Sequence, residues 1–304
     1  MFTDNNSQSE DLYLNTVGAD KVFTPVVLLL LDGWGVAPLS EANVFTTAKM
    51  PVLSSLLTEY PVALLKTGVK NWNSRYLTLG AGAIVNNDEE KVPLNLTTIL
   101  ATAGKQQIKI MDTERLAALT YFFNGQIEGR QVGEDWQVIS TKAGGGLRPL
   151  NAAKRVTEEL CQTLKGLKQY DFIVAALPLI DLMAMSGDVN QIKKAAETID
   201  KLLANILAAL PDGGVLLISA AGGNAEKNLD LVSGGIDESL TDNPVPFLLV
   251  NRDFIGRTIG ITSPTSEDLS LLAPIGSLAD IAPTILHLLN LKQPETMSGK
   301  NLWL

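Results

Sequence analysis

Residues 26–35 read VVLLLLDGWG. Six consecutive apolar residues, without the alternation of a half-exposed strand, predict a strand that is covered on both faces. The aspartate and glycine that follow favour a turn, so the strand ends there. A strand of this kind belongs in the middle of a parallel sheet with helices on both sides. The sequence therefore places Asp32 just beyond the carboxyl end of a central strand.

The same arrangement recurs along the chain, where short apolar segments alternate with segments of helical spacing. Helices are predicted from Pro51, over 151–168, over 189–210 and after Asp280, because apolar residues recur there at intervals of three and four. Strands are predicted at residues 25–31, 62–67, 107–111, 119–124, 136–140, 171–177, 214–220 and 245–250. Because strands and helices alternate, the expected fold class is an α/β three-layer sandwich with a mostly parallel central sheet.

Composition limits the classes of function. The chain has 304 residues, with 24 Lys and Arg against 33 Asp and Glu, which gives a formal net charge of −9. This balance argues against a nucleic-acid partner, because such partners call for clustered basic residues. One cysteine excludes a disulfide framework and cysteine-rich metal sites, and one histidine excludes a site that needs two imidazoles from this chain.

No stretch has the pattern of a membrane or export segment. Apolar runs such as residues 26–31 are far shorter than the ~20 residues of a membrane-spanning helix. Residues 1–20 are polar and acidic, and they lack the basic start and apolar stretch of a signal peptide. We therefore expect a disordered or extra N-terminal tail at 1–20, a single domain at 21–304, no membrane association and a cytoplasmic location.

Three loops are expected to meet at the edge of the sheet where the parallel strands end. Asp32 follows the first strand, Asp181 follows the strand at 171–177, and the segment 221–224 follows the strand at 214–220. Ligand sites in such sheets lie outside the carboxyl ends of the strands. The sequence therefore predicts that any functional site lies between these loops.

Six segments in collinear order carry a resemblance to a known family. They are LLDGWG at 30–35, LGAGAIV at 79–85, DTER at 112–115 with TYFFNG at 120–125, NPVPF at 243–247, GSLADIAPT at 276–284 and MSGK at 297–300. In these segments the chain resembles the cofactor-independent phosphoglycerate mutases of the alkaline phosphatase superfamily. The resemblance implies an alkaline phosphatase-like fold from about residue 26 to residue 302.

The resemblance also implies a dinuclear metal centre, a serine that carries the phosphoryl group, and a second domain with substrate-orienting arginines. In the family this domain is inserted after the LGAG segment. Here only residues 86–92 separate that segment from the chain that returns to the phosphatase-like domain. The insert is absent, and the residues that position a phosphoglycerate are absent with it.

Most of the metal ligands that the resemblance implies are replaced. Asp32 and Asp181 match two metal-binding aspartates. The remaining ligand positions carry side chains that cannot coordinate manganese or magnesium strongly: Met185, Ala221, Gly222 and Leu240 (or Ser239 in the adjacent register). Asp32 and Asp181 are then either structural residues or a vestigial ion site. If they lie together without metal, one of their pKa values should rise unless a counter-ion pairs with them.

The nucleophile position has two readings. An ungapped alignment back from Leu79 places Trp72 there, whereas a two-residue deletion places Ser74 there. Ser74 and Arg115 are the vestigial catalytic candidates. Arg115 matches a lysine of the family, and it keeps the positive charge but is no equivalent proton donor. It is also the expected counter-ion of the two aspartates.

We expect a catalytically inactive relative of the phosphoglycerate mutases that acts as a binding or scaffolding protein. A protein partner or a homo-oligomer fits this role. No cofactor is expected, and any residual site would take manganese or magnesium. One alternative is a divergent metal-dependent phosphatase or phosphomutase with a reduced metal site. Another is a metal-free module that binds phosphate or other anions through backbone amides at Gly222, Gly223 and Asn224.

Overall fold

The computed structural model describes residues 21–40, 43–86, 90–140, 148–228, 237, 239–259 and 268–303. The proposed tail at 1–20 lies outside these residues. In the described ranges the sheet has eight strands in the order β4-β3-β5-β1-β6-β7-β2-β8, and only β7 runs antiparallel to its neighbours. The strands are β1 (Val26–Leu30), β2 (Val62–Lys66), β3 (Gln107–Asp112), β4 (Glu134–Ile139), β5 (Phe172–Ala176), β6 (Val215–Ser219), β7 (Val245–Val250) and β8 (Gly276–Ser277).

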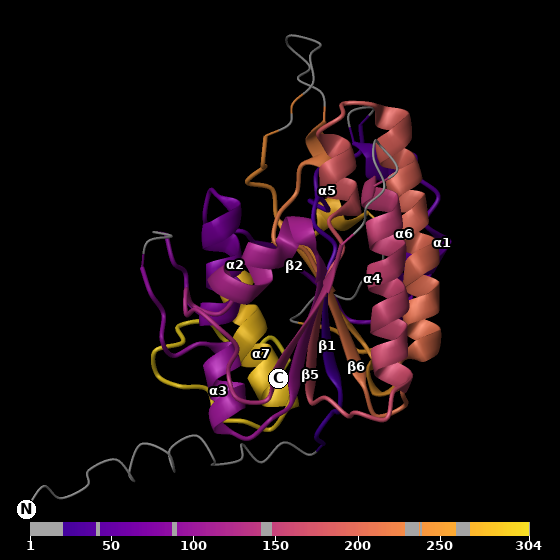
Figure 1. The fold of residues 1–304 in the computed structure, drawn as a ribbon. Coiled ribbons are helices and arrows are strands. Elements are labelled where there is room, and N and C mark those ends of the chain that lie inside the picture. The colour runs from indigo at the N-terminus through magenta and orange to yellow at the C-terminus, as the bar shows by residue number, and fades with distance from the viewer. Residues whose placement is uncertain are drawn as a thin grey trace, which may run out of the picture.

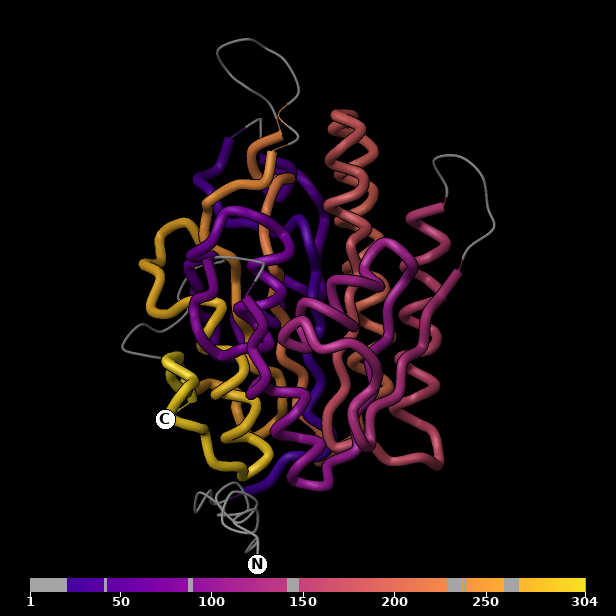
Figure 2. Tube along the Cα trace, turned by 60° about the vertical axis from the view of Figure 1, so that its left-hand side comes forward, coloured from indigo at the N-terminus to yellow at the C-terminus, as the bar shows by residue number. Residues whose placement is uncertain are grey.

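Helices cover both faces of the sheet, which gives the three layers expected from the sequence (Figure 1). One layer contains α1 (Pro51–Glu59), α4 (Arg148–Lys165) and α6 (Val189–Ala209), and the other contains α2 (Trp72–Ala81), α3 (Leu96–Thr102) and α7 (Ile281–Leu288). The rotated view in Figure 2 keeps α4 and α6 on the opposite side of the sheet from the yellow C-terminal segment. A short helix, α5 (Leu179–Ala184), follows β5 directly.

The central strand β1 fixes the edge of the sheet at which the site lies. All five of its residues are fully buried, because β5 and β6 flank it and helices cover both faces. Its last residue, Leu30, pairs with Ala176 of β5 and Ser219 of β6. The three strands therefore end at the same level, and the loops that follow them meet, as predicted from the sequence.

One predicted strand, residues 119–124, is wrong. The segment forms a π-helix over Ala118–Phe122. The amide of Phe123 donates to the carbonyl of Ala118 at 2.9 Å, and the amide of Gln126 donates to that of Tyr121 at 2.8 Å. A short apolar run does not distinguish a buried strand from a buried helical turn, and here the i to i+5 bonds of a π-helix satisfy the backbone.

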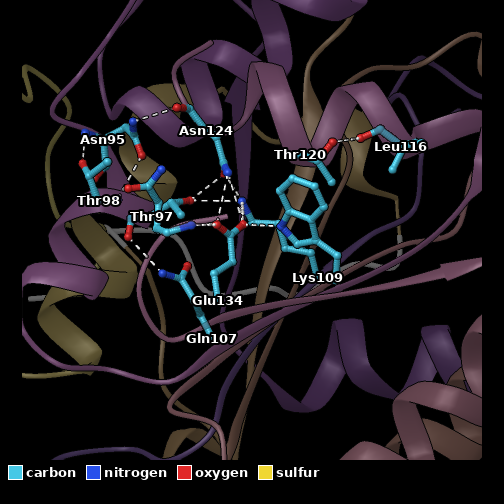
Figure 3. A network of polar contacts seen from close by, with 11 residues as sticks. Asn95, Thr97, Thr98, Gln107, Lys109, Leu116, Thr120, Asn124 and Glu134 are labelled. Carbon is cyan, nitrogen blue, oxygen red and sulfur yellow. Dashed lines mark hydrogen bonds and ion pairs between the residues drawn. The ribbon is translucent and has the colours of Figure 1, made fainter. Parts of the chain in front are cut away.

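A buried polar network joins the outer strands β3 and β4 to Asn124, which lies just after this π-helix (Figure 3). Lys109 of β3 pairs with Glu134 of β4 at 3.0 Å and also donates to Asn124. Glu134 also accepts from the side-chain amide of Asn124 at 3.1 Å and from the indole N–H of Trp136 at 2.6 Å. The network thus holds β3 in place, and Arg115 lies in the turn that follows this strand.

Among the described residues, no helix combines the length and the apolar character that crossing a bilayer requires. The main cluster of buried apolar side chains extends from Phe23 to Leu302 and includes side chains from both helical layers.

Candidate functional site

Asp32 is the most enclosed acidic group at the carboxyl edge of the sheet. It is 0% exposed, and its Oδ2 accepts from the hydroxyl of Tyr76 at 2.6 Å and from Nε of Arg115 at 2.7 Å. Its Oδ1 accepts from the backbone N–H of Ala221 at 3.0 Å. Burial raises the pKa of Tyr76 well above its ordinary value, and Asp32 adds to the rise, so the Tyr76 hydroxyl stays protonated and donates.

Asp181 lies beside Asp32, in the first turn of α5. Its backbone N–H donates to the carbonyl of Asp32 at 3.1 Å. Its carboxylate accepts from Nδ2 of Asn224 at 2.6 Å and from Nη2 of Arg115. Burial raises the pKa of Asp181, Arg115 opposes that rise and the negative charge of Asp32 adds to it. The rise in the pKa of Asp181 therefore comes mainly from burial, and Asp32 makes a smaller contribution to it.

One guanidinium joins the two aspartates. Arg115 is 9% exposed and contacts Asp32 through Nε and Asp181 through Nη2, so the predicted counter-ion is confirmed. Burial alone would lower the pKa of Arg115, but Asp32, Tyr76 and Asp181 raise it well above its ordinary value. Asp112, at the end of β3, positions Arg115 because its carboxylate accepts from the Arg115 backbone N–H at 3.3 Å.

Helix α2 presents Trp72 and Tyr76 to this centre. The Arg115 guanidinium carbon lies 4.9 Å from the Trp72 ring centroid, and Tyr76 binds Asp32 one turn later. Ser74 lies two residues from each, which is about 200° around a helix. Ser74 is fully buried, and its hydroxyl has no hydrogen-bond partner in the described structure. The side chain that α2 presents to Arg115 at its first turn is therefore Trp72.

The loop after β6 closes the centre from the other side. Gly33 and Gly223 form a β-bridge, and the amide of Gly33 donates to the carbonyl of Gly222 at 2.9 Å. Ala221 is fully buried and contributes only its backbone N–H to Asp32. Gly222 lies against the Arg75 guanidinium, so that a Cβ at this position would collide with Arg75 Nη1.

The candidate anion nest is a buried part of the same loop. Gly222, Gly223 and Asn224 are all buried, and the amide of Asn224 is directed at the carbonyl of Gly33 at 3.5 Å. The carboxylate of Glu226 lies against Gly223, because a Cβ there would meet both of its oxygens. A side chain of the protein therefore already occupies the space beside Gly223, and external anion binding stays a prediction.

The other positions implied by the resemblance lie around this centre. Met185 caps the end of α5 and is 55% exposed, and its amide faces the carbonyl of Asp181 at 3.4 Å. Leu240 is half-buried, and one of its methyl groups would lie 2.8 Å from a Cβ on Gly222. Within the described part of the chain, no three His, Cys, Asp or Glu side chains form a group that could hold a metal ion.

Two residues of the centre, Tyr76 and Arg75, were not identified from the sequence. Tyr76 contacts Asp32, and Arg75 lies against Gly222. Asn224 was expected to act through its backbone amide, whereas its side chain donates to Asp181 at 2.6 Å. Tyr76 follows Trp72 by four residues, and this spacing places both on one helical face, which is the signal that could have pointed to it. No signal in the sequence pointed to Arg75, because no helix was predicted over residues 72–81.

Comparison with known proteins agrees with this architecture. The model of the metalloenzyme superfamily matches residues 24–293. The chain belongs to this superfamily, whose fold is alkaline phosphatase-like.

Curated relatives have a more specific name. The chain is 35% identical over 216 residues to a 2,3-bisphosphoglycerate-independent phosphoglycerate mutase of Psychromonas ingrahamii. The matched region covers 70% of this chain and 39% of the relative. The chain is 36% identical over 210 residues to the enzyme of that name from Chloroflexus aggregans. This match covers 68% of this chain and 37% of the relative. The chain thus spans well under half the length of these relatives.

Solved structures share the fold at low sequence identity. A phosphoglycerate mutase from Leishmania mexicana superposes with a TM-score of 0.76 at 12% identity, covering 94% of this chain and 99% of that one. An alkaline phosphatase superfamily protein from Vibrio parahaemolyticus superposes with a TM-score of 0.63 at 15% identity, covering 95% of this chain and 71% of that one.

Proposed function

We propose that this chain is a non-catalytic relative of the phosphoglycerate mutases and acts as a binding or scaffolding protein. The observation that carries the proposal is Arg115, whose guanidinium contacts Asp32 and Asp181 at once. These are the two carboxylates that remain from the metal-binding set of the family. A guanidinium donates hydrogen bonds and accepts none, so it holds the carboxylates without offering a Lewis acid.

The residues present do not fit the two-metal centre that the family implies. A divalent ion needs several deprotonated oxygen or nitrogen donors at once. Asp32 and Asp181 are the two donors left, and their oxygens already accept from Arg115, Tyr76 and Asn224. Met185, Ala221, Gly222 and Leu240, at the other expected donor positions, have no side-chain oxygen or nitrogen. Ser239, the alternative to Leu240, is exposed, and its hydroxyl donates to Asp237. We therefore derive no reaction step through a metal ion.

The arrangement of α2 also supports the proposal. Phosphoryl transfer through a serine requires a hydroxyl that is held next to an activating group. Trp72 lies against Arg115 on the face of α2 that meets the aspartates, and Ser74 lies on another face of that helix. An indole ring cannot carry a phosphoryl group.

A binding role is supported by apolar side chains near this centre. Leu116 follows Arg115 and is 38% exposed, and Met185 follows Asp181 by one turn and is 55% exposed. Exposed apolar side chains suit a protein partner better than a phosphorylated small molecule.

A second candidate is a metal-dependent phosphatase with a reduced site. One observation favours it, because Asp32 and Asp181 are both present and lie close enough to share a guanidinium. In this case Arg115 would have to leave the carboxylates when a metal ion binds.

The deciding experiment is an activity assay on the whole chain. Purified protein is incubated with 3-phosphoglycerate and manganese, and 2-phosphoglycerate is measured, with a parallel assay of phosphate release from p-nitrophenyl phosphate. We expect no metal-dependent product in either assay. Product that disappears in Asp32→Asn would overturn the proposal, because it would show chemistry at this centre.

A further inference from the structure

Two arginines enter the carboxyl edge of the sheet from different elements. Arg115 comes from the turn after β3 and contacts Asp32 and Asp181. Arg75 comes from α2 and is fully buried. Its Nε donates to the carbonyl of Val69 at 2.8 Å, and its Nη2 donates to the carbonyl of Thr241 at 2.7 Å. Both guanidinium groups are therefore held in place by bonds to other segments.

The guanidinium of Arg75 occupies the space that a side chain at position 222 would need. A Cβ on Gly222 would collide with Nη1 of Arg75, and it would lie 3.3 Å from the guanidinium carbon. Any side chain at position 222, an imidazole included, therefore requires Arg75 to move. The arginine is tethered by two backbone carbonyls, so this movement would break both hydrogen bonds.

The charge of Arg75 is retained at this buried position. Burial lowers the pKa of Arg75 to about 10, and the carboxylates of Asp242, Glu226 and Asp32 oppose that change. The group is therefore protonated at neutral pH. Asp242 is the nearest of these acids, at 3.5 Å from Nη2.

We propose that Arg75 and Arg115 are built-in cations that take the place of the metal pair which the family implies. Arg115 supplies the positive charge between the two aspartates, and Arg75 fills the space beside position 222. The inference rests on the proposed function and adds a cause to it. Metal is excluded because two side chains of the protein occupy the centre, and the loss of ligands at positions 221 and 222 accompanies that occupation.

The first test is a double-mutant cycle between Arg75 and Gly222. Because buried overpacking and broken hydrogen bonds add together, Gly222→His should lower the melting temperature of the wild type by about 10 °C. In the Arg75→Ala background the same substitution should cost less than half as much, because the space is free. Gly213→His is the matched control, since Gly213 is exposed and a Cβ there meets only the carbonyl of Thr24 at 3.5 Å.

An additive cycle, in which Gly222→His costs the same in both backgrounds, would overturn the role of Arg75. The control substitution should have the same small effect in both backgrounds. Coupling confined to Gly222→His supports the inference.

The second test removes the charge of Arg115 and uses manganese alone as the probe. Arg115→Met leaves two buried carboxylates without a counter-ion and should lower the melting temperature by about 10 °C. Millimolar manganese chloride should then raise the melting temperature of this variant by about 3 °C or more, while that of the wild type and of Arg115→Lys stays unchanged. Adding Asp32→Asn to Arg115→Met should abolish the manganese response.

Should Arg115→Met not fold, Arg115→Met/Asp181→Asn provides the same information without metal, because removing one carboxylate removes part of the repulsion. The double variant should then fold and melt cooperatively, and a double variant that also fails to fold would overturn the inference. An Arg115→Met protein that folds and ignores manganese would also overturn it. These outcomes are distinct from failure of the proposed function, which is measured as turnover by the wild type.

Discussion

Lys109 of β3 and Glu134 of β4 form an ion pair of 3.0 Å in which neither side chain reaches solvent. Glu134 also accepts from Asn124 and Trp136, so its charge is fully hydrogen-bonded within the protein (Figure 3). A buried pair of this kind contributes little net stability compared with an apolar pair of the same size, but a single unpaired member is costly.

Replacing one member of the pair should therefore destabilise the protein more than replacing both. We expect Lys109→Met to reduce the free energy of unfolding by about 3–5 kcal/mol, because it leaves the Glu134 carboxylate buried without its cation. Lys109→Met/Glu134→Gln should recover at least half of that loss. Urea unfolding followed by circular dichroism measures both values, and a double variant less stable than the single one would contradict the expectation.

The same pair predicts a dependence of stability on pH. Burial lowers the pKa of Lys109 from 10.5 to about 8, and Glu134 opposes this change. Between these two pH values the unfolded chain keeps a proton that the folded chain has lost, so the contribution of Lys109 to stability rises as pH rises. The gain approaches about 3 kcal/mol at 1.36 kcal/mol per pH unit.

The measurement compares unfolding free energies at pH 7 and pH 9.5 for the wild type and for Lys109→Met/Glu134→Gln. Subtracting the two proteins removes the contribution of tyrosines and other lysines that titrate in both. The wild type should gain stability relative to the double variant as pH rises. A difference that stays constant with pH would show that Lys109 keeps an ordinary pKa.

The sequence predicted the central sheet well because its strands are apolar on both faces. The runs at 26–31 and 171–177 could be assigned from composition alone, and both are strands in the structure. The segment 119–124 failed because an equally apolar run is buried as a π-helix. The Lys109–Glu134 pair was not predicted either, because a charged residue in an outer strand usually faces water and the π-helix that covers it was not foreseen.

The charged residues of the candidate site could be predicted from the sequence, but the side chains that α2 packs against them could not. Asp32, Asp181 and Arg115 follow strand ends or family motifs, so a parallel sheet brings them together. Tyr76 and Arg75 meet the centre through the rotation of α2 about its axis, which depends on packing that a single sequence does not specify. The choice between Trp72 and Ser74 depended on the same rotation, since a shift of two residues turns a side chain to another face.

Removing the Tyr76 hydroxyl measures how much its hydrogen bond from α2 to Asp32 contributes to the stability of the protein. We expect Tyr76→Phe to reduce the free energy of unfolding by about 1.5–3 kcal/mol, because a buried carboxylate loses a hydrogen bond of 2.6 Å. Tyr60→Phe, in a half-buried position at the end of α1 in the opposite helical layer, is the control and should cost under about 0.5 kcal/mol. Chemical denaturation measures both, and equal losses would mean that the hydroxyl of Tyr76 contributes nothing specific.

Gly33 provides a test of the close approach between the loop that carries Asp32 and the first turn of α5, which carries Asp181. Its φ is +96°, and a Cβ there would collide with the backbone nitrogen of Asp181 and lie 2.8 Å from its Cα. Gly33→Ala therefore adds a steric clash to an unfavourable backbone conformation, and we expect it to lower the free energy of unfolding by about 3 kcal/mol or more.

Gly104→Ala separates the two effects, because Gly104 also has a positive φ, of +69°, but a Cβ there meets nothing within 4 Å. That control should cost about 1 kcal/mol, the price of the backbone conformation alone. Urea unfolding of both variants gives the difference. A Gly33→Ala protein no less stable than Gly104→Ala would mean that the Asp32 loop and the start of α5 do not approach as closely as described.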